Sequence, residues 1–228
     1  LTLSRMVHFT LFGIPVYIRP SFWVVLAIFG GALSISSVED LIYPALFVIA
    51  GFVAILSHEM GHALVGRKLG GGQQTIVLEL FGGLTSSHGM QLTRGGRALM
   101  ILAGPMMTLL LGIISLGLTW NIVAPVMTSY NLNFWDLAIS PFTAALISPK
   151  LYILSCLIMI GEWWTILNLL PIYPLDGGQL IAQYIRSPRK VFMTGFITAI
   201  LIGLLSFQLF HGYFIPIFMA LFAYSNYR

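Results

Sequence analysis

ALFVIAGFVAILSHEMGHALVG, residues 45–66, is apolar enough to cross a bilayer as a helix, yet it contains two histidines and a glutamate. His58 and His62 are four residues apart, so a helix places both imidazoles on one face with Glu59 beside them. This HExxH spacing allows two neutral imidazoles to hold zinc while the glutamate takes a proton from water. Ionisable side chains cost a few kcal/mol each inside a membrane helix, which disfavours a chance match. The sequence therefore predicts a catalytic zinc site within a membrane-spanning helix.

The composition of the chain indicates an integral membrane protein. Of its 228 residues, 58% are hydrophobic and only 8% are charged, and the mean hydropathy is +0.93. Soluble domains carry about 25% charged residues. The formal net charge of +4 comes from basic residues spread along the chain, which suits membrane topology better than nucleic-acid binding. No nucleic-acid partner is expected, and the single cysteine, Cys156, allows no internal disulfide.

The hydrophobic pattern predicts an all-α polytopic membrane protein with about six transmembrane helices in one domain, residues 1–228. The expected spans are residues 21–37, 41–66, 97–120, 151–170, 191–209 and 212–226. Residues 7–18 and 74–88 instead predict β-hairpins, because short extended segments flank glycine-containing turns. Strand edges cannot face lipid, so we expect the two hairpins to form a small membrane-associated β-sheet that lies against protein.

The positive charges predict the orientation of the chain. With the N-terminus inside, ten of the eleven Lys and Arg residues fall in cytoplasmic segments, and only Lys150 falls outside. Both chain ends are then cytoplasmic, and the two histidines lie toward the cytoplasmic side of the membrane. The first twenty residues lack the pattern of a signal peptide, so no cleaved signal is expected.

A catalytic zinc ion needs a third protein ligand and one open position. The ionisable candidates are Glu79, His88, Glu162 and Asp176. Asp176 is favoured because it lies in PIYPLDGG, residues 171–178, where prolines bend the fourth span and glycines allow close backbone approach. Broken helices at membrane depth line cavities or are buried in protein. We therefore expect Asp176 to point inward and complete the ligand set.

Asn168 lies shortly before this break in the fourth span. A buried amide there could donate to a developing oxyanion or orient the carbonyl of a substrate. It could equally form a hydrogen bond between helices. The residues alone leave both interpretations open.

Two motifs together resemble the site-2 protease family of intramembrane zinc metalloproteases, in its compact branch without a PDZ domain. They are HEMGH at residues 58–62 and NLLPIYPLDGG at residues 168–178. The segments FGIPVYIRPSFW (residues 12–23) and FGGLTSSHG (residues 81–89) extend the resemblance over nearly the whole chain. Thr108 departs from the family pattern, because relatives commonly carry Asn there.

The resemblance implies a role for each candidate residue. His58, His62 and Asp176 would bind one catalytic Zn²⁺, Glu59 would activate water, and Asn168 would assist substrate binding or oxyanion stabilisation. The implied activity is that of a zinc metalloendopeptidase in regulated intramembrane proteolysis. Its substrates would be single-span transmembrane proteins within the lipid bilayer. A bacterial or archaeal cell membrane is the expected location.

A transmembrane substrate must be locally unwound before its carbonyls can be attacked. We expect the strand TIVLEL to offer a free edge to which an extended substrate adds. The substrate-binding residues would then be Thr75, Ile76, Val77 and Leu78, together with Asn168. The alternative from another class is a metal or ion transporter, whose broken helices look similar. A transporter does not require Glu59, so exchange of Glu59 for Gln separates the two functions.

Overall fold

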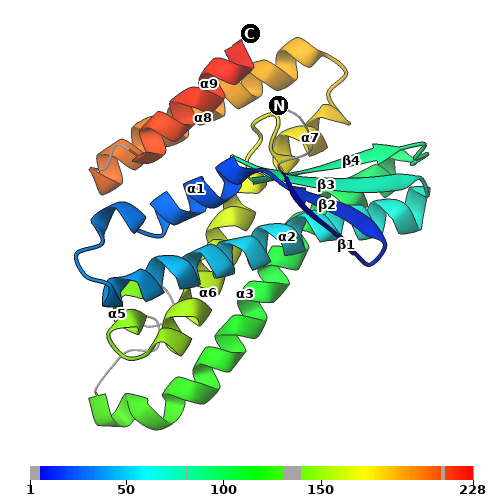
Figure 1. The fold of residues 1–228 in the computed structure, drawn as a ribbon. Coiled ribbons are helices and arrows are strands. Elements are labelled where there is room, and N and C mark those ends of the chain that lie inside the picture. Colours follow the sequence, from blue (N-terminus) through cyan, green and yellow to red (C-terminus); the bar gives the residue numbers. More distant parts are fainter. Residues whose placement is uncertain (1–5, 81, 131–139, 212–213, 228) are drawn as a thin grey trace. The chain divides into compact units, whose positions relative to one another are not determined.

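The structure of the protein is a computed structural model that describes residues 6–80, 82–130, 140–211 and 214–227. The chain divides into two units, Leu1–Thr165 and Ile166–Arg228. The first unit contains β1 (Val7–Leu11), β2 (Ile14–Ile18), α1 (Pro20–Phe29), the 3-10 turns η2 (Ala32–Ser34) and η3 (Glu39–Leu41), α2 (Ile42–Gly70), β3 (Gln73–Glu79), β4 (Gly82–His88), α3 (Arg94–Tyr130), α5 (Pro141–Ala145) and most of α6 (Pro149–Asn168) (Figure 1). The second unit contains the end of α6, α7 (Asp176–Ala182), α8 (Pro188–Phe210) and α9 (Phe214–Tyr227).

Both predicted hairpins are confirmed, and they join into one sheet with the strand order β1-β2-β3-β4. In the first hairpin, Phe12 and Gly13 have φ angles of 50° and 75°, as a two-residue turn between twisted strands requires. The two hairpins meet through parallel pairing of β2 with β3, in which Val16 lies opposite Ile76. Among the described strands, β1 and β4 are therefore the outer ones.

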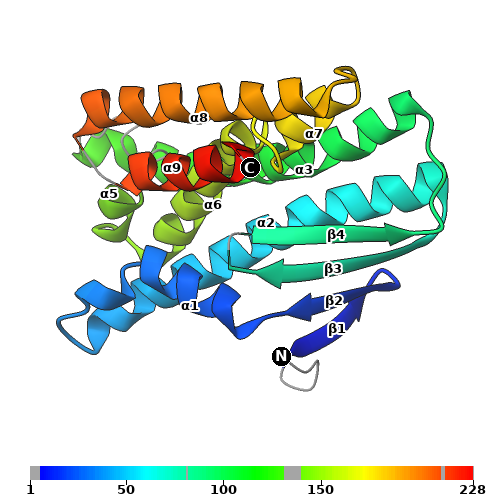
Figure 2. The ribbon, with the colours of Figure 1, turned by 90° about the horizontal axis from the view of Figure 1, so that it is seen from above.

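One face of the sheet is buried against α1 and α2. Ile14, Val16 and Ile18 of β2 alternate with more exposed residues, and Ile76 and Leu78 of β3 do the same. These side chains form a single hydrophobic cluster with residues of both helices, Phe22, Leu26, Ile55, Leu56, Met60 and Ala63. Figure 2 shows β3 and β4 running along α2. This packing holds the second hairpin beside the helix that carries the HExxH motif.

Within the described residues, four helices are long and apolar enough to cross a membrane. They are Glu39–Gly70, Arg94–Ile122, Pro149–Asn168 and Pro188–Leu209. They correspond to the predicted spans 41–66, 97–120, 151–170 and 191–209. The structure thus agrees with a mostly helical integral membrane protein that carries a small sheet, whereas the count of six spans stays a prediction.

Two helix lengths differ from the sequence-based expectation. Helix α1 has ten residues, because the chain turns at Gly30 and Gly31 instead of continuing to residue 37. Ten residues rise about 15 Å, half the thickness of a bilayer core. Helix α9 has 14 residues, close to the expected span 212–226, and rises about 21 Å. Helix α3 continues to Tyr130, so the expected loop over residues 121–149 begins as helix, and its residues 131–139 lie outside the described part.

The predicted break in the fourth span is confirmed. Helix α6 ends at Asn168 and α7 begins at Asp176. A Cβ atom placed on Gly177 would lie 2.2 Å from the carbonyl oxygen of Leu169, so only glycine allows the backbones to approach this closely. Asn226 Nδ2 of α9 donates to the carbonyl oxygen of Tyr173 at 2.6 Å. The segment before Asp176 is thus packed tightly within the second unit.

Candidate metal centre

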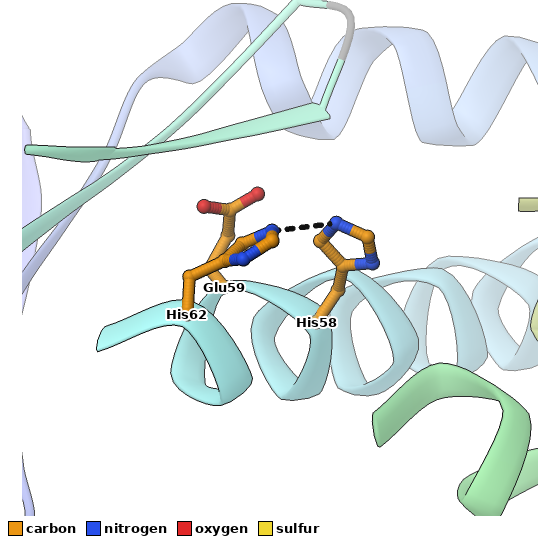
Figure 3. A group of neighbouring side chains, drawn as sticks. All are labelled: His58, Glu59 and His62. Carbon is orange, nitrogen blue, oxygen red and sulfur yellow. Dashed lines mark hydrogen bonds between the residues drawn. The ribbon is translucent and has the colours of Figure 1, made fainter. Parts of the chain in front are cut away.

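The HExxH residues form a compact group on α2. His58, Glu59 and His62 are only 2%, 5% and 8% exposed, although all three side chains are polar or ionisable. The imidazoles point toward one another, with 3.0 Å between their Nε2 atoms (Figure 3). Each of the three residues offers one atom that could bind a metal ion, and these three atoms lie within 4.8 Å of one another. Among the described residues, this is the one cluster of three or more such side chains that could hold a metal ion.

The Nδ1 atom of each imidazole lies near a hydrogen-bond acceptor. His62 Nδ1 lies 2.8 Å from the carbonyl oxygen of Met100, which can only accept, so Nδ1 carries the proton. His58 Nδ1 lies 3.5 Å from Thr108 Oγ1. A proton on Nδ1 leaves a lone pair on Nε2, which is the arrangement found in metal-binding histidines. Both Nε2 atoms are therefore suited to bind the same ion.

The spacing of these donors fits zinc, the metal implied by the motif. Tetrahedral zinc with Zn–N bonds of about 2.0–2.1 Å brings two ligand nitrogens to roughly 3.3 Å from each other. The Nε2 atoms are 3.0 Å apart, and two lone pairs at that distance repel unless a cation lies between them. Imidazole with carboxylate is a donor set typical of catalytic zinc. The residues present therefore fit a zinc ion.

Close packing of α2 on α3 shapes the pocket around the histidines. A Cβ atom on Gly61, inside the HEMGH motif, would lie 2.4 Å from the carbonyl oxygen of Ala103. A Cβ atom on Gly104 would lie 2.2 Å from His62 Nε2 and 2.8 Å from His58 Nε2. Glycine at both positions lets α3 approach the two imidazoles without filling the space for the ion. The sequence alone does not predict this role of Gly104, although the Gly104-Pro105 pair is an unusual feature inside an apolar span.

Two buried threonines, Thr108 of α3 and Thr165 of α6, have their hydroxyl groups next to each other, and the Thr108 hydroxyl lies near His58. Thr108, fully buried, places its Oγ1 3.0 Å from the carbonyl oxygen of Pro105 and 3.0 Å from Thr165 Oγ1. Thr165 Oγ1 in turn lies 3.2 Å from the Pro105 carbonyl oxygen. With its proton donated to one of these acceptors, Thr108 Oγ1 can accept the Nδ1 proton of His58. The threonine therefore supplies an acceptor for the ring of His58.

We expect Thr108→Val to weaken zinc binding by roughly tenfold, the lower end of the range for outer ligand partners, because the 3.5 Å contact is long. Valine keeps the shape of threonine but removes the acceptor for His58. Competition with a fluorescent zinc chelator measures the change, and Thr108→Ser, which keeps the hydroxyl, should bind zinc as the natural protein does. Equal affinity of the Val and Ser variants would contradict this role.

The other candidate site residues differ in their partners and in their exposure. Glu79 pairs with Arg19 at 2.7 Å, and both His88 and Glu162 are exposed. Asp176 is 5% exposed at the start of α7, and Asn168 is 9% exposed at the end of α6. Both residues belong to the second unit. Their convergence on the two histidines stays a prediction.

The expectation that TIVLEL provides a free strand edge is wrong. Strand β3 lies between β2 and β4 and pairs with both. Its residues Ile76, Val77 and Leu78 are paired on both sides and offer no open edge to a substrate strand, and Thr75 pairs with Ser86 of β4. The second hairpin by itself leaves one side of β3 open, and the N-terminal hairpin closes that side by parallel pairing over a long sequence separation. The outer strand beside the metal centre is β4.

Strand β4 also contributes contacts that the sequence analysis missed. Thr85 Oγ1 donates to Glu59 Oε2 at 2.7 Å, and a Cβ atom on Gly83 would lie 2.2 Å from Glu59 Cγ. Both residues belong to the FGGLTSSHG segment. A Gly-Gly pair followed by a hydroxyl residue in a hairpin beside an apolar helix was the available signal.

Comparison with known proteins identifies the family. The model of Peptidase family M50 matches residues 46–210, well over half of the chain. The chain belongs to this family. This M50 chain is 29% identical to zinc metalloprotease MJ0392 of Methanocaldococcus jannaschii in an alignment that covers 95% of this chain and 57% of that protein. It is 28% identical to putative zinc metalloprotease sll0528 of Synechocystis in an alignment that covers 77% of this chain and 43% of that protein.

The M50 chain spans about half the length of these two curated relatives. Its structure is similar to that of a site-2 protease from Methanocaldococcus jannaschii, with a TM-score of 0.61 and 24% sequence identity. The match covers 97% of this chain and 94% of that chain, and it shows a shared fold. The resemblance to the site-2 protease family is thus confirmed, and with it the zinc ion that the family implies.

Proposed function

We propose that this chain is an intramembrane zinc-dependent endopeptidase that cleaves transmembrane segments of membrane proteins. One observation carries the proposal. Two buried Nε2 atoms lie 3.0 Å apart beside the carboxylate of Glu59, within a helix that is apolar enough to span a membrane. Membership of a peptidase family and likeness to a zinc metalloprotease support it.

His58, His62 and Asp176 would hold the metal, and each is buried. When bound, zinc supplies Lewis-acid chemistry, which polarises a peptide carbonyl and acidifies water. Among the described residues, Glu59 is the acidic side chain that groups with the two imidazoles, with one metal-binding atom of each residue within 4.8 Å of the others, which suits it to act as the general base. Two neutral histidines and one carboxylate leave a position open to water and substrate.

Glu59 moves the proton in the proposed reaction. Its carboxylate accepts a proton from water as the water oxygen bonds to the carbonyl carbon of the substrate. It then returns that proton to the amine nitrogen as the carbon–nitrogen bond breaks. The amide of Asn168 would orient the carbonyl or stabilise the oxyanion. The products are a new carboxyl terminus and a new amino terminus, so atoms and charge balance.

The substrate would be a single-span membrane protein whose transmembrane helix is locally unwound in the bilayer. An extended segment needs a partner for its backbone hydrogen bonds when it leaves the helical state. Strand β4 is suited to this, because it pairs only with β3 among the described strands and runs along α2 at the metal centre. This placement replaces the strand edge first expected at β3.

The proposed orientation puts both chain ends and the metal centre on the cytoplasmic side of a bacterial or archaeal cell membrane. The basic residues Arg67 and Lys68 in the last turn of α2 support it, since positive charges are retained on the cytoplasmic side. His62 lies just over one helical turn before them, so water would reach the site from that side.

The purified protein, reconstituted with zinc in detergent, provides the test. We expect the natural chain to contain one zinc ion and to cleave a model single-span substrate. Glu59→Gln should keep the zinc while cleavage falls by about 100-fold to 10,000-fold, the range for losing a general base. Glu162→Gln removes an exposed carboxylate from α6 and serves as the matched control.

The same variants separate the protease from a transporter. Zinc retention with full loss of cleavage in Glu59→Gln supports hydrolysis. Zinc flux into liposomes that persists in Glu59→Gln, with no cleavage by the natural chain, would support a transporter instead.

A further inference from the structure

Strand β4 presents one of its faces to the helix that carries the HExxH motif. In the pairing of β3 with β4, Thr85 lies opposite Ile76 and Gly83 lies opposite Leu78. Residues opposite each other in a sheet share a face, and both Ile76 and Leu78 are completely buried in the cluster that includes α2. Thr85 and Gly83 therefore face α2 as well.

The hydroxyl of Thr85 contacts Glu59 at two atoms. Thr85 Oγ1 lies 2.7 Å from Glu59 Oε2 and 3.2 Å from the Glu59 carbonyl oxygen. A threonine hydroxyl has a single proton to donate. The distance to Oε2 is the usual one for a hydrogen bond from a hydroxyl to a carboxylate, which is stronger than one to a neutral carbonyl. The proton is therefore donated mainly to the carboxylate.

Gly83 also limits the position of the Glu59 side chain, through the backbone of β4. A Cβ atom there would lie 2.2 Å, 2.5 Å and 2.6 Å from Cγ, Cδ and Oε1 of Glu59. The carboxylate thus lies directly against the backbone of β4, and Glu59 is only 5% exposed. The last torsion angle of a glutamate is broad when nothing restrains it. Here the backbone at Gly83 and the hydrogen bond from Thr85 restrain it together.

We infer that Thr85 is a positioning residue for the general base, and this inference rests on the proposed function. A general base needs one carboxylate oxygen to accept the proton of water, and the hydrogen bond from Thr85 occupies the other. Thr85 thereby fixes the rotation of the carboxylate, one oxygen of which lies within 4.8 Å of a ring nitrogen of each histidine. Because Thr85 belongs to the strand assigned to the substrate, the strand that would align the peptide also aligns the base.

A variant series tests this role. Thr85→Val keeps the size and branching of the side chain but removes the hydroxyl, and Thr85→Ser keeps the hydroxyl. Misplacing a catalytic group by about 1 Å costs on the order of 100-fold in rate, so we expect kcat of Thr85→Val to fall by roughly 10-fold to 100-fold. KM, zinc content and melting temperature should stay close to those of the natural chain. Thr85→Ser should regain most of the lost kcat.

Thr10→Val provides the matched control, because Thr10 is an exposed strand residue in β1. It should leave kcat, KM and zinc content unchanged. Unchanged kcat in Thr85→Val, with the natural chain active, would overturn the inference and leave the proposed function intact. Equal loss of zinc or of thermal stability in the Val and Ser variants would also overturn it, by showing that Thr85 only supports packing. Absence of cleavage by the natural chain would overturn the proposed function and the inference together.

Discussion

Replacing Gly104 by alanine is expected to abolish zinc binding and, with it, cleavage. The added Cβ atom would lie 2.2 Å from Nε2 and 2.4 Å from Cε1 of His62, and 2.8 Å from Nε2 of His58. Contacts below 3.0 Å essentially never occur for real Cβ atoms. The rings cannot move aside freely, since the Met100 carbonyl holds the far nitrogen of His62 at 2.8 Å. Zinc affinity should therefore fall by more than the roughly 100-fold upper range for losing an outer ligand partner.

The fold should lose only a little stability through the change at Gly104. The overlap costs about 1–3 kcal/mol, as overpacking usually does, and the preference of a helix interior for alanine over glycine offsets about 1 kcal/mol of this cost. Gly117→Ala is the matched control, because Gly117 lies on the same helix and a Cβ atom there meets nothing within 4 Å. Zinc content by elemental analysis and thermal melting in detergent measure both effects. Full zinc occupancy in Gly104→Ala would contradict the account of the pocket.

The parts of the site that the sequence predicts are those set by local geometry. Residues four apart on a helix share a face, so the convergence of His58 and His62 follows from their spacing alone. The break before Asp176 follows from Pro171 and Pro174, which cannot continue a helix, and from the glycines that pack against the bent segment. The hairpins follow from extended segments that flank turns. Each of these features depends on residues close together in the chain.

The parts that the sequence did not predict depend on contacts between distant residues. Gly104 and Thr108 contact the histidines only because α3 packs on α2, and their spacing within α3 does not indicate which face that is. Strand β3 became an inner strand because the N-terminal hairpin pairs with it in parallel, which no local pattern specifies. Helix α1 ends early for a local reason, the Gly30-Gly31 pair. The prediction of a span over residues 21–37 followed the hydrophobic pattern and gave this pair too little weight.

Replacing Asp176 by alanine is the second change with a large expected effect. The residue is 5% exposed, and a buried carboxylate is costly unless it is paired or binds a metal. Its backbone is fixed by the approach of Gly177 and Gly178 to the carbonyl groups of the preceding segment. A ligand on a backbone held this firmly binds a metal at a smaller ordering cost. If it is the third ligand, its loss leaves two imidazoles, and zinc affinity should fall by more than about 100-fold.

Thermal melting with and without zinc separates a ligand from a structural aspartate. Ligand that binds only the folded state stabilises it by about 2.7 kcal/mol at 100 times its dissociation constant, so added zinc should raise the melting temperature of the natural chain and not that of Asp176→Ala. With zinc removed by a chelator, the two proteins should melt at similar temperatures. Glu79→Ala and Glu162→Ala, which remove a surface ion pair and an exposed carboxylate, should keep the zinc-dependent rise. A rise that survives in Asp176→Ala would contradict its assignment as the third ligand. If the rise also disappears in one of the two controls, that glutamate becomes the candidate for the third ligand.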